Sequence, residues 1–315
     1  MSTILVTGAN GFVGSHTVPA LLGAGHRVVA MVRSRAAGET LLERLPAPQR
    51  TEVEVREADV THPATLGPAL AGVDAVVHLV AIPRDFNGGA DLARVNTEGT
   101  RAVLGAMAAT GVRRLVHLGA MGVADDPNLH YASSKARAEA AVRDSGLDWT
   151  ILKPSLQFGP GDGFFNIVAR LIRISPGIVP VPGDGKSQFQ PIYVGDVATV
   201  VVHSLADPST IGATFELGGP RYWSYREITA EVLRALGKHR AIVPMPIPLI
   251  RLVAGAAELV HLPFPVATDQ LRQLRLDNVG PLDLIPSRFG FEPRPMDDAF
   301  GYLRRTSHDQ YGAAG

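Results

Sequence analysis

The sequence predicts an α/β fold in which a doubly wound parallel sheet carries a smaller C-terminal α/β lobe. First, short apolar runs rich in β-branched residues alternate with longer Ala- and Leu-rich stretches, which is the pattern of repeated βαβ units. Second, crossovers between parallel strands are right-handed, which makes a doubly wound sheet the economical topology. Third, the chain after Pro154 turns to glycine- and proline-rich segments around one short helix, which indicates a lobe laid over the sheet.

The expected elements of the sheet begin almost at the first residue. Strands are predicted at residues 4–6, 27–32, 53–55, 75–79, 115–118 and 150–152. Helices are predicted between them at residues 13–23, 64–71, 92–110 and 131–145. Beyond the sheet, Ser224 and Glu227 form a capping box that starts a further helix, and Gly237 ends it.

The length of the chain, 315 residues, is enough for two hydrophobic cores, since a domain takes roughly 150 residues. We expect the larger domain to cover residues 1–158 together with about 187–220. We expect the smaller lobe to cover residues 159–186 and 221–315 and to hold a substrate or a partner.

The composition excludes several classes of protein. Because 30 Lys and Arg balance 30 Asp and Glu, there is no basic field to attract nucleic acid. The absence of cysteine excludes disulfides and thiolate chemistry, and it suits a reducing compartment. The first residues do not resemble a secretory signal, and no run of ~18 apolar residues is free of charges or prolines. We therefore expect a cytoplasmic protein without a nucleic-acid partner.

The histidines do not predict a metal site. The chain has 10 of them, but none forms an HxH, HxxxH or HExxH set. His78 and His117 fall in predicted core strands, so packing in the core is the better interpretation of both.

One apolar segment at residues 242–265 has two interpretations. It combines several prolines with a helix predicted from about residue 249 to 262. Packing against the smaller lobe is the simpler interpretation. The alternative is a helix that lies on a membrane surface or contacts a protein partner, which would make the protein peripheral to the membrane.

Three glycines follow the first strand in a GxxGxxG spacing, in the run Thr7-Gly8-Ala9-Asn10-Gly11-Phe12-Val13-Gly14. Gly8 allows a tight turn, Gly11 lets the backbone approach a pyrophosphate, and Gly14 lets the helix pack closely on the strand. The helix N-terminus adds unpaired N–H groups and a partial positive charge. A simple strand-to-helix turn is the alternative, but the position within the first βαβ unit favours a Rossmann-type dinucleotide site.

The end of the second strand selects the cofactor in such a site. A carboxylate there accepts hydrogen bonds from the ribose hydroxyls of NAD, whereas arginine accommodates the 2′-phosphate of NADP. The residues present are Arg33, Ser34 and Arg35, and no acid follows until Glu39. We therefore favour NADP(H) over NAD(H), with solvated surface arginines as the alternative. After the third strand, Asp59 and Val60 are expected near the adenine.

Tyr131 and Lys135 lie one turn apart on the same face of a predicted helix. A nearby ammonium lowers the pKa of a phenol, and it can also hold the nicotinamide ribose. The spacing YxxxK alone is common, and a plain helix surface is the alternative. Together with the glycine loop, the pair resembles the short-chain dehydrogenase/reductase superfamily, in which such a Tyr is the acid/base and the Lys its partner.

Further segments resemble the extended or atypical branch of this superfamily, which is similar to NAD-dependent epimerases and dehydratases, over nearly the whole chain. The resemblance places Leu79, Val80 and Ala81 where the fourth strand meets the cofactor. It makes Asn96 the helix residue that orders the site, and it puts Pro154 beside the nicotinamide. Residues 161–166, 190–198 and 215–220 look like the subgroup that contains the nucleotide-binding accessory subunit of respiratory complex I and its bacterial relatives.

One departure from the superfamily concerns the hydroxyl that holds the substrate oxygen. The superfamily has Ser or Thr just past the fifth strand, but residues 118–122 read Leu-Gly-Ala-Met-Gly, and no hydroxyl side chain occurs from residue 112 to 130. Loss of one such donor commonly costs on the order of 10²-fold in rate. The backbone N–H groups of Gly119 and Ala120, or the hydroxyl of Ser155, are the candidates to replace it.

Two functions follow from these residues. The first is an NAD(P)-dependent oxidoreductase or epimerase with an unidentified small-molecule substrate, in which Tyr131, Lys135 and Asn96 form the catalytic set. The second is a non-catalytic protein that holds a nucleotide for a structural or regulatory purpose and is related to the complex I accessory subunit. The missing hydroxyl favours the second, and the presence of both Tyr131 and Lys135 favours the first, to which we incline. No oligomeric state is predicted.

Overall fold

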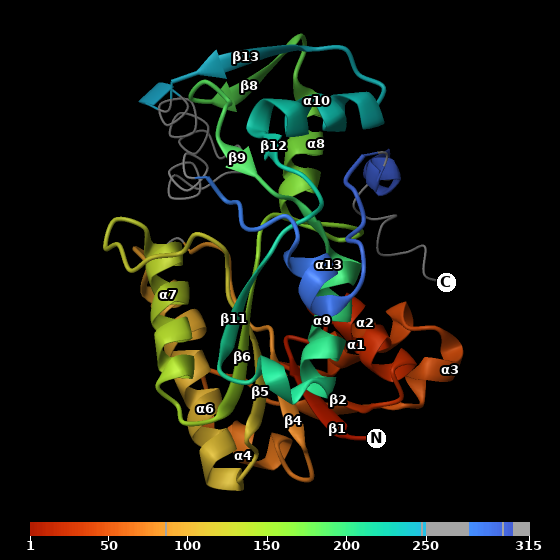
Figure 1. Cartoon of the computed structure of the whole chain (residues 1–315), viewed down its shortest axis with the longest axis vertical. Coiled ribbons are helices and arrows are strands. Elements are labelled where there is room, and N and C mark those ends of the chain that lie inside the picture. Colours follow the sequence, from red (N-terminus) through yellow and green to blue (C-terminus); the bar gives the residue numbers. More distant parts are fainter. Residues whose placement is uncertain (86, 247, 250–276, 298, 305–315) are drawn as a thin grey trace.

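The computed structural model describes the chain except residues 86, 247, 250–276, 298 and 305–315 (Figure 1). Its centre is a 7-stranded sheet in the order β11-β6-β5-β4-β1-β2-β3, in which all neighbours are parallel. The strands are β1 Thr3–Thr7, β2 Arg27–Val32, β3 Val53–Glu57, β4 Ala75–His78, β5 Arg114–Leu118, β6 Asp148–Pro154 and β11 Ala213–Leu217. The chain order reverses beside β1, which has β2 on one side and β4 on the other. The predicted doubly wound sheet is therefore confirmed.

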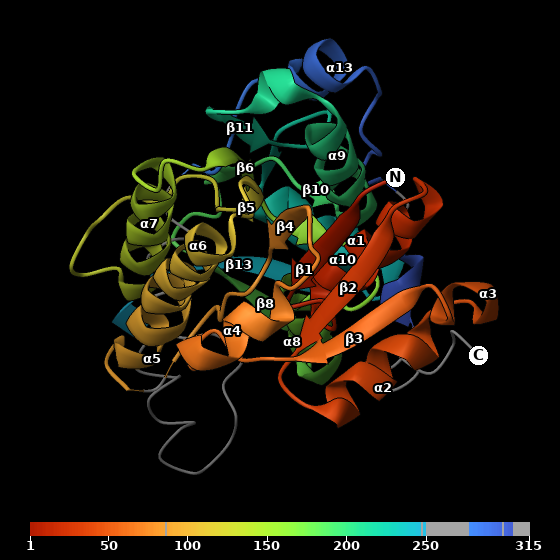
Figure 2. The ribbon, with the colours of Figure 1, turned by 90° about the horizontal axis from the view of Figure 1, so that it is seen from below.

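Helices cover both faces of this sheet (Figure 2). One face carries α1 Phe12–Gly23, α2 Arg35–Arg44 and α9 Val194–Ala206, and the other carries α4 Leu66–Ala69, α6 Gly99–Thr110 and α7 His130–Arg143. Along β1, Ile4 and Val6 pack into one core and Leu5 into the other, because successive side chains of a strand point to opposite faces. Burial on both faces explains why the strands consist of continuous apolar residues.

The smaller lobe lies beyond the carboxyl ends of the strands (Figure 1). It contains α8 Phe164–Ile174, β8 Ile178–Pro182, β9 Gln188–Phe189, β12 Trp223–Ser224, α10 Tyr225–Ala235, β13 Ala241–Met245 and η4 Ala299–Arg304. β8 pairs with β13, and β9 pairs with β12. The core of the lobe is built around the rings of Phe158, Phe165 and Phe300, whose centroids lie 4.8 to 6.2 Å apart. The capping box predicted at Ser224 is present at the start of α10.

The structure also contains elements that the sequence pattern does not predict, among them β11, α2 and the short α3 Ala47–Arg50. In α2, a Cβ at Gly38 would lie 2.6 Å from Cγ1 of Val55, so the glycine lets this helix approach β3. The helix predicted at 92–110 is divided into α5 Ala90–Leu92, a π-helical turn η2 Ala93–Glu98, and α6. The remaining short elements are η1 Pro63–Thr65, β7 Gln157–Phe158, β10 Ile192–Tyr193, η3 Pro208–Thr210 and α13 Leu284–Phe289.

The apolar segment 242–265 falls mostly outside the described residues. Its start belongs to β13, and of the helix predicted from about 249 to 262 only residue 249 is described. Within the described part of the chain, every helix is too short or too polar to span a bilayer.

Candidate active site

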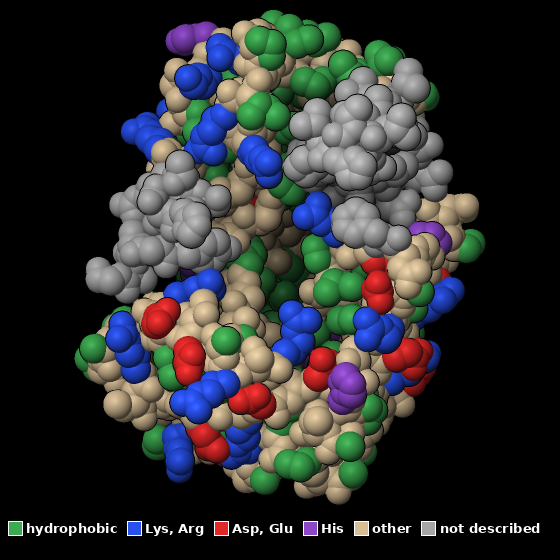
Figure 3. Space-filling model, turned by 180° about the vertical axis from the view of Figure 1, so that it is seen from behind, with side chains coloured by type: hydrophobic (Ala, Val, Ile, Leu, Met, Phe, Trp, Pro, Cys, Tyr) green, Lys and Arg blue, Asp and Glu red, His purple; other side chains and the backbone are tan. Residues whose placement is uncertain are grey.

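A cleft of about 830 Å³ opens between the carboxyl ends of the strands and the smaller lobe. Figure 3 shows this hollow between the two parts of the molecule. The loops that follow β1 to β6 form one side of the cleft, and α8 with its neighbours forms the other. The cleft therefore lies where the strand order reverses, which is the usual ligand position in an open α/β sheet.

The loop after β1 has the backbone that the glycine spacing predicts. Gly8 has a φ of +67°, and the N–H of Gly11 donates to the Gly8 carbonyl oxygen at 3.0 Å, which closes a tight turn. A Cβ at Gly14 would lie only 2.3 Å from that same oxygen, so α1 can start close to the turn only with glycine there. Because Gly11 has no side chain to cap α1, the N-terminus of the helix faces the cleft with free N–H groups.

Of the predicted residues in this loop, six line the cleft, namely Gly8, Asn10, Gly11, Phe12, Val13 and Gly14. Thr7 does not. Its side chain is buried between β1 and β4, where it accepts a hydrogen bond from the Leu79 N–H at 3.1 Å and meets Nδ1 of His78 at 2.7 Å. Thr7 therefore holds the two strands that carry the cleft in register.

After β2, the structure brings only one of the three predicted residues to the cleft. Arg33 lines it, but the hydroxyl of Ser34 accepts the Ala37 N–H at 3.3 Å and caps α2. The side chain of Arg35 is 86% exposed and pairs with Glu39 at 3.0 Å, away from the cleft. Both side chains thus contact the first turns of α2, and contact of Ser34 and Arg35 with the cofactor stays a prediction.

Asp59 and Val60 line the cleft beside Arg33. The Asp59 carboxylate accepts hydrogen bonds from both the N–H and the hydroxyl of Thr61, each at 2.8 Å. Burial works to raise the pKa of Asp59, but these two bonds and the charges of His62 and Arg33 lower it overall. The structure thus places an ionised carboxylate and a guanidinium together at this end of the cleft.

The segment after β4 lines the middle of the cleft through Leu79, Val80 and Ala81, as predicted. Its course is fixed by Asn96, which lies in η2 and is 1% exposed. The Asn96 side chain accepts from the Ile82 N–H at 2.8 Å, and it donates to the Ile82 carbonyl at 3.1 Å and to the Ser134 hydroxyl at 3.0 Å. Asn96 does not line the cleft, so it orders the site by joining this segment to α7 rather than by touching a ligand.

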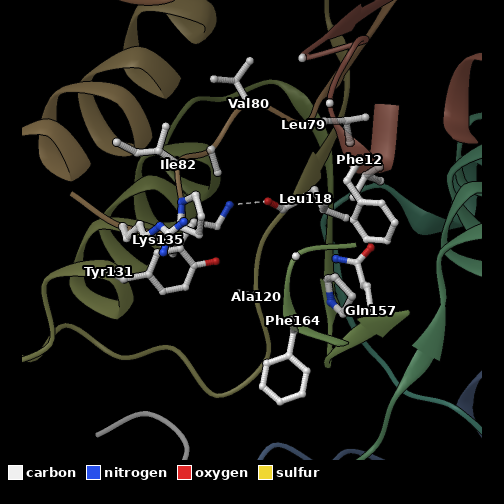
Figure 4. A pocket seen from close by; sticks show the side chains of 18 of the residues that line it. Phe12, Leu79, Val80, Ile82, Leu118, Ala120, Tyr131, Lys135, Gln157 and Phe164 are labelled. Atoms are coloured by element: carbon white, nitrogen blue, oxygen red, sulfur yellow. Dashed lines mark hydrogen bonds between the residues drawn. The ribbon is translucent and has the colours of Figure 1, made fainter. Parts of the chain in front are cut away.

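Tyr131 and Lys135 both point from α7 into the cleft (Figure 4). The Lys135 ammonium donates to the Leu118 carbonyl oxygen at 2.5 Å, at the end of β5. Burial lowers the pKa of Lys135 to about 8, although the charge of Glu139 opposes this. Pro154, also predicted, lines the cleft at the end of β6.

The expected lowering of the Tyr131 pKa by Lys135 is wrong. Burial raises the pKa of Tyr131 to about 12, and the negative charge of Glu139 adds to the increase. The spacing of four residues does place both side chains on one face, but the ammonium is directed at the Leu118 carbonyl. Tyr131 is therefore a stable phenol at neutral pH.

Glu139 carries the negative charge beneath this pair and is 2% exposed. It accepts from the Ala120 N–H at 3.2 Å and forms ion pairs with Arg143 at 3.1 Å and Lys153 at 3.7 Å. A Cβ at Gly119 would lie 2.5 Å from its Oε1 atom, which accounts for glycine at that position.

The proposed replacements for the missing hydroxyl are all engaged elsewhere. The Gly119 N–H donates to the Leu152 carbonyl at 2.7 Å, and the Ala120 N–H donates to Glu139. The Ser155 hydroxyl donates to the Asn278 carbonyl at 2.9 Å and accepts from the Gln190 N–H at 3.2 Å. These groups hold β5, β6 and the lobe together, so none of them is directed at a substrate oxygen.

The sequence analysis did not identify Gln157, which comes from the short strand β7. Figure 4 shows its side chain pointing into the cleft from the wall opposite Tyr131. Its buried Oε1 atom has no hydrogen-bond partner among the described residues. A two-residue strand has no periodicity that could reveal such a position from the sequence.

The interpretation of His78 and His117 as core residues is confirmed, since each is 1% exposed and their rings stack with centroids 5.4 Å apart. His78 lies between the hydroxyls of Thr7 at 2.7 Å and Thr100 at 3.0 Å. Burial lowers the pKa of His78 to about 3, and the charge of Lys135 adds to this effect. The pair is therefore neutral and packs beneath Lys135.

Comparisons with known proteins agree with this geometry. The profile of the NAD dependent epimerase/dehydratase family matches residues 4–218. A ceramide reductase of Caulobacter vibrioides is 30% identical, over 99% of this chain and 95% of its own. A mitochondrial NADH dehydrogenase [ubiquinone] 1 alpha subcomplex subunit 9 of Arabidopsis thaliana is 25% identical, over 93% of this chain and 73% of its own. The structure of a dTDP-glucose 4,6-dehydratase from Streptomyces venezuelae with NAD superimposes with a TM-score of 0.72 at 23% identity, covering 98% of both chains.

Proposed function

This chain belongs to the NAD dependent epimerase/dehydratase family, and on that premise we propose that it is a reductase that uses NADP(H) and protonates the substrate oxygen through Tyr131. The resemblance to the subgroup of the complex I accessory subunit is confirmed by its relatives. The observation that carries the proposal is that the glycine loop, Tyr131 and Lys135 line one and the same cleft.

The residues around the cleft fit a dinucleotide. The uncapped N-terminus of α1 and the loop at Gly8 to Gly14 suit a pyrophosphate, since both offer backbone N–H groups to an anion. Arg33 and Asp59 lie at the end where the adenosine would bind. We assign the 2′-phosphate of NADP to Arg33, because the next acid along the chain, Glu39, is paired with Arg35 outside the cleft. The bound nicotinamide would supply the hydride.

Tyr131 is suited to act as an acid rather than as a base. With a pKa of about 12, only about one phenol in 10⁵ is ionised at pH 7. A proton is therefore available for a carbonyl oxygen, whereas removal of a proton from an alcohol by this residue would be rare. This protonation state suits Tyr131 to the reduction that we propose. Lys135 holds the end of β5 in place through Leu118 and keeps a positive charge beside the cofactor site.

Gln157 supplies a polar side chain on the wall of the cleft opposite Tyr131. Since the Gly119, Ala120 and Ser155 groups are engaged, we assign to the Nε2 amide group of Gln157, a donor, the hydrogen bond that the missing hydroxyl would donate to the substrate oxygen. We expect the smaller lobe, predicted at residues 159–186 and 221–315, to hold the substrate. A cytoplasmic location remains a prediction.

A direct test measures the oxidation of NADPH by absorbance with a panel of ketones, quinones and keto sugars. We expect turnover that Tyr131→Phe reduces by at least about 10²-fold, because a positioned proton donor contributes 10²- to 10⁴-fold. The affinity for NADPH should stay within about threefold, since the phenol is not needed to bind the dinucleotide. Unchanged turnover in Tyr131→Phe would refute the assignment of the acid.

A second function deserves consideration because no replacement for the missing hydroxyl is free on the β5 side of the cleft. In this alternative the protein holds its nucleotide without turnover and is part of a larger assembly. The name of its relative from Arabidopsis thaliana describes that protein as a subunit of a subcomplex. The expected result is then a co-purifying nucleotide that raises the melting temperature but is not consumed by any carbonyl compound. Steady NADPH oxidation that depends on Tyr131 would exclude this alternative.

A further inference from the structure

One face of α8 is apolar and lines the cleft. The residues that line it are Phe164, Ile167, Val168 and Leu171, which follow the i, i+3, i+4, i+7 spacing of a single helix face. The neighbouring face, with Phe165 and Ile172, is packed into the core of the lobe. Phe164, Ile167 and Leu171 are only half-buried, so this stripe is directed at the cleft instead of at the core.

The surfaces next to this stripe are apolar as well. Leu156, Phe189 and the ring of Tyr225 continue the lining, and the Tyr225 ring packs edge to face against Phe164 with centroids 6.1 Å apart. In Figure 3 hydrophobic side chains line the visible part of the hollow, and in Figure 4 the Phe164 ring projects below the space between Tyr131 and Gln157.

The described cations that line the cleft come from the sheet side. Among the described lining residues, Arg33 and Arg84 come from the loops after β2 and β4, Arg94 comes from η2, and Lys135 donates to the Leu118 carbonyl. On the lobe side, the one charged lining residue that the structure describes is Asp277, an acid that accepts the Gln188 N–H at 2.9 Å.

This distribution of charge argues against a nucleotide sugar as the substrate. The diphosphate of such a substrate would lose its hydration on entering the cleft, and that loss is large unless cations or several N–H groups replace the water. The described lobe side offers no cation for this purpose. An aliphatic chain, in contrast, gains affinity there, by up to about fourfold for each methylene group removed from water.

The stripe also leads out of the cleft. Ile174 lies one turn beyond Leu171 on the same helix, and it is 70% exposed. From Phe164 to Leu171 the stripe runs about 10 Å along the helix axis. A chain that followed it would reach the surface, so the described walls place no upper limit on its length.

We propose that the cleft takes a carbonyl compound with a long aliphatic chain, which lies along Phe164, Ile167 and Leu171 while its carbonyl group faces Tyr131. The position of the carbonyl rests on the proposed function, but the chain site does not. It is a property of α8 and can be tested without turnover.

Calorimetry with the full chain tests the chain site. The probes are methyl ketones with octyl, decyl and dodecyl chains, with UDP-glucose and dTDP-glucose as the competing class. Each is added to the protein without dinucleotide and to the protein with NADP⁺, which has no hydride to transfer to a ketone. We expect the dissociation constant of the ketones to fall with every added methylene group, by up to about fourfold. Affinity that is independent of chain length, or a nucleotide sugar that binds more tightly than the dodecyl ketone, would overturn the proposal.

Variants of α8 distinguish binding at this site from nonspecific binding of ketones elsewhere on the protein. Ile167→Asp should raise the dissociation constant of the dodecyl ketone by at least about tenfold, because a carboxylate then faces the apolar chain. The matched control is Arg170→Asp, at an exposed position on the same helix that does not line the cleft. This variant should change the dissociation constant of the dodecyl ketone by less than about twofold. If Ile167→Asp does not fold, Leu171→Ala should still raise the dissociation constant of the dodecyl ketone severalfold. Equal losses in the Ile167 and Arg170 variants would refute the site.

Different experimental results would refute the chain site and the proposed reductase function. Ketones that bind with the expected dependence on chain length but do not cause NADPH oxidation would refute the reductase and leave the chain site intact. Turnover of a nucleotide sugar that depends on Tyr131 would support the oxidoreductase and refute the chain site.

Discussion

Substitution of Gly14 tests the geometry of the phosphate loop most directly. In Gly14→Ala the new Cβ would lie 2.3 Å from the Gly8 carbonyl oxygen and 2.5 Å from that of Ala9. Both are backbone atoms, so neither can rotate away. To restore an ordinary contact distance of 3.4 Å, the loop and the start of α1 must separate by about 1.1 Å.

A displacement of this size is large compared with the tolerance of a hydrogen bond. An N–H group that donates to a phosphate oxygen at about 2.9 Å would be left near 4 Å, where the bond is lost. One lost charge-assisted bond is worth about 1.5–3 kcal/mol, so we expect NADPH to bind between about 10-fold and 150-fold more weakly. The crowding itself should lower the free energy of unfolding by about 1–3 kcal/mol.

The chain supplies a graded series of controls. A Cβ at Gly11 would lie 3.2 Å from the Gly8 carbonyl oxygen, and one at Gly23, in the last position of α1, would meet nothing within 4 Å. Calorimetric titration with NADPH and urea unfolding should therefore rank Gly14→Ala as the most damaging, Gly11→Ala as intermediate and Gly23→Ala as neutral or stabilising by up to about 1 kcal/mol. If Gly14→Ala binds NADPH as tightly as Gly23→Ala, the phosphate loop is assigned to the wrong place.

Three further predictions concern the remainder of the cleft. Arg33→Ala should weaken the binding of NADPH by roughly 10-fold or more and change the affinity for NADH by less than about twofold, as measured by titration of both cofactors. Equal losses of affinity would contradict the preference for NADP(H). Gln157→Ala should lower kcat by on the order of 10²-fold at unchanged NADPH affinity, and unchanged kcat would remove Gln157 from the site. Because the pKa of Lys135 is lowered from 10.5 to about 8, its ammonium is lost from the native protein as the pH rises through 8. The affinity for NADPH should then fall. Between pH 8 and 10.5 the contribution of Lys135 to the free energy of unfolding should rise, because the unfolded chain still binds the proton in this range. Lys135→Gln should abolish both trends.

The parts of the site that the sequence predicts correctly depend on local geometry. The backbone at Gly8 and Gly14 follows from a strand, a turn and a helix within a dozen residues, and the spacing of Tyr131 and Lys135 follows from one turn of α7. Ser34 and Arg35 show the limit of the same reasoning. Their positions after β2 were predicted, but the start of α2 engages both side chains, and a pattern that does not predict α2 cannot reveal this.

The parts that the sequence does not reveal depend on contacts between distant segments. β11 joins the sheet beside β6, some 60 residues earlier in the chain, with Phe215 opposite Leu152 in the register. Whether the Gly119 N–H is free depends on Leu152, and whether the Ser155 hydroxyl is free depends on Asn278. The spacing of residues within one segment carries no information on such pairings, so the sequence could not show that the suggested replacement donors are engaged elsewhere.

The electrostatics of Tyr131 illustrate why a motif does not determine a mechanism. The YxxxK spacing by itself suggests an ammonium that stabilises a phenolate. In the folded protein burial penalises the phenolate, and the negative charge of Glu139, eight residues further along α7, penalises it again, so the pKa of Tyr131 rises to about 12. Lys135 meanwhile donates to the Leu118 carbonyl. Below pH 8 the pair is therefore a phenol beside an ammonium, which is the protonation state that a reduction consumes and an oxidation must first remove. The protonation state of the proposed acid thus follows from Glu139 and from burial, two features that lie outside the motif.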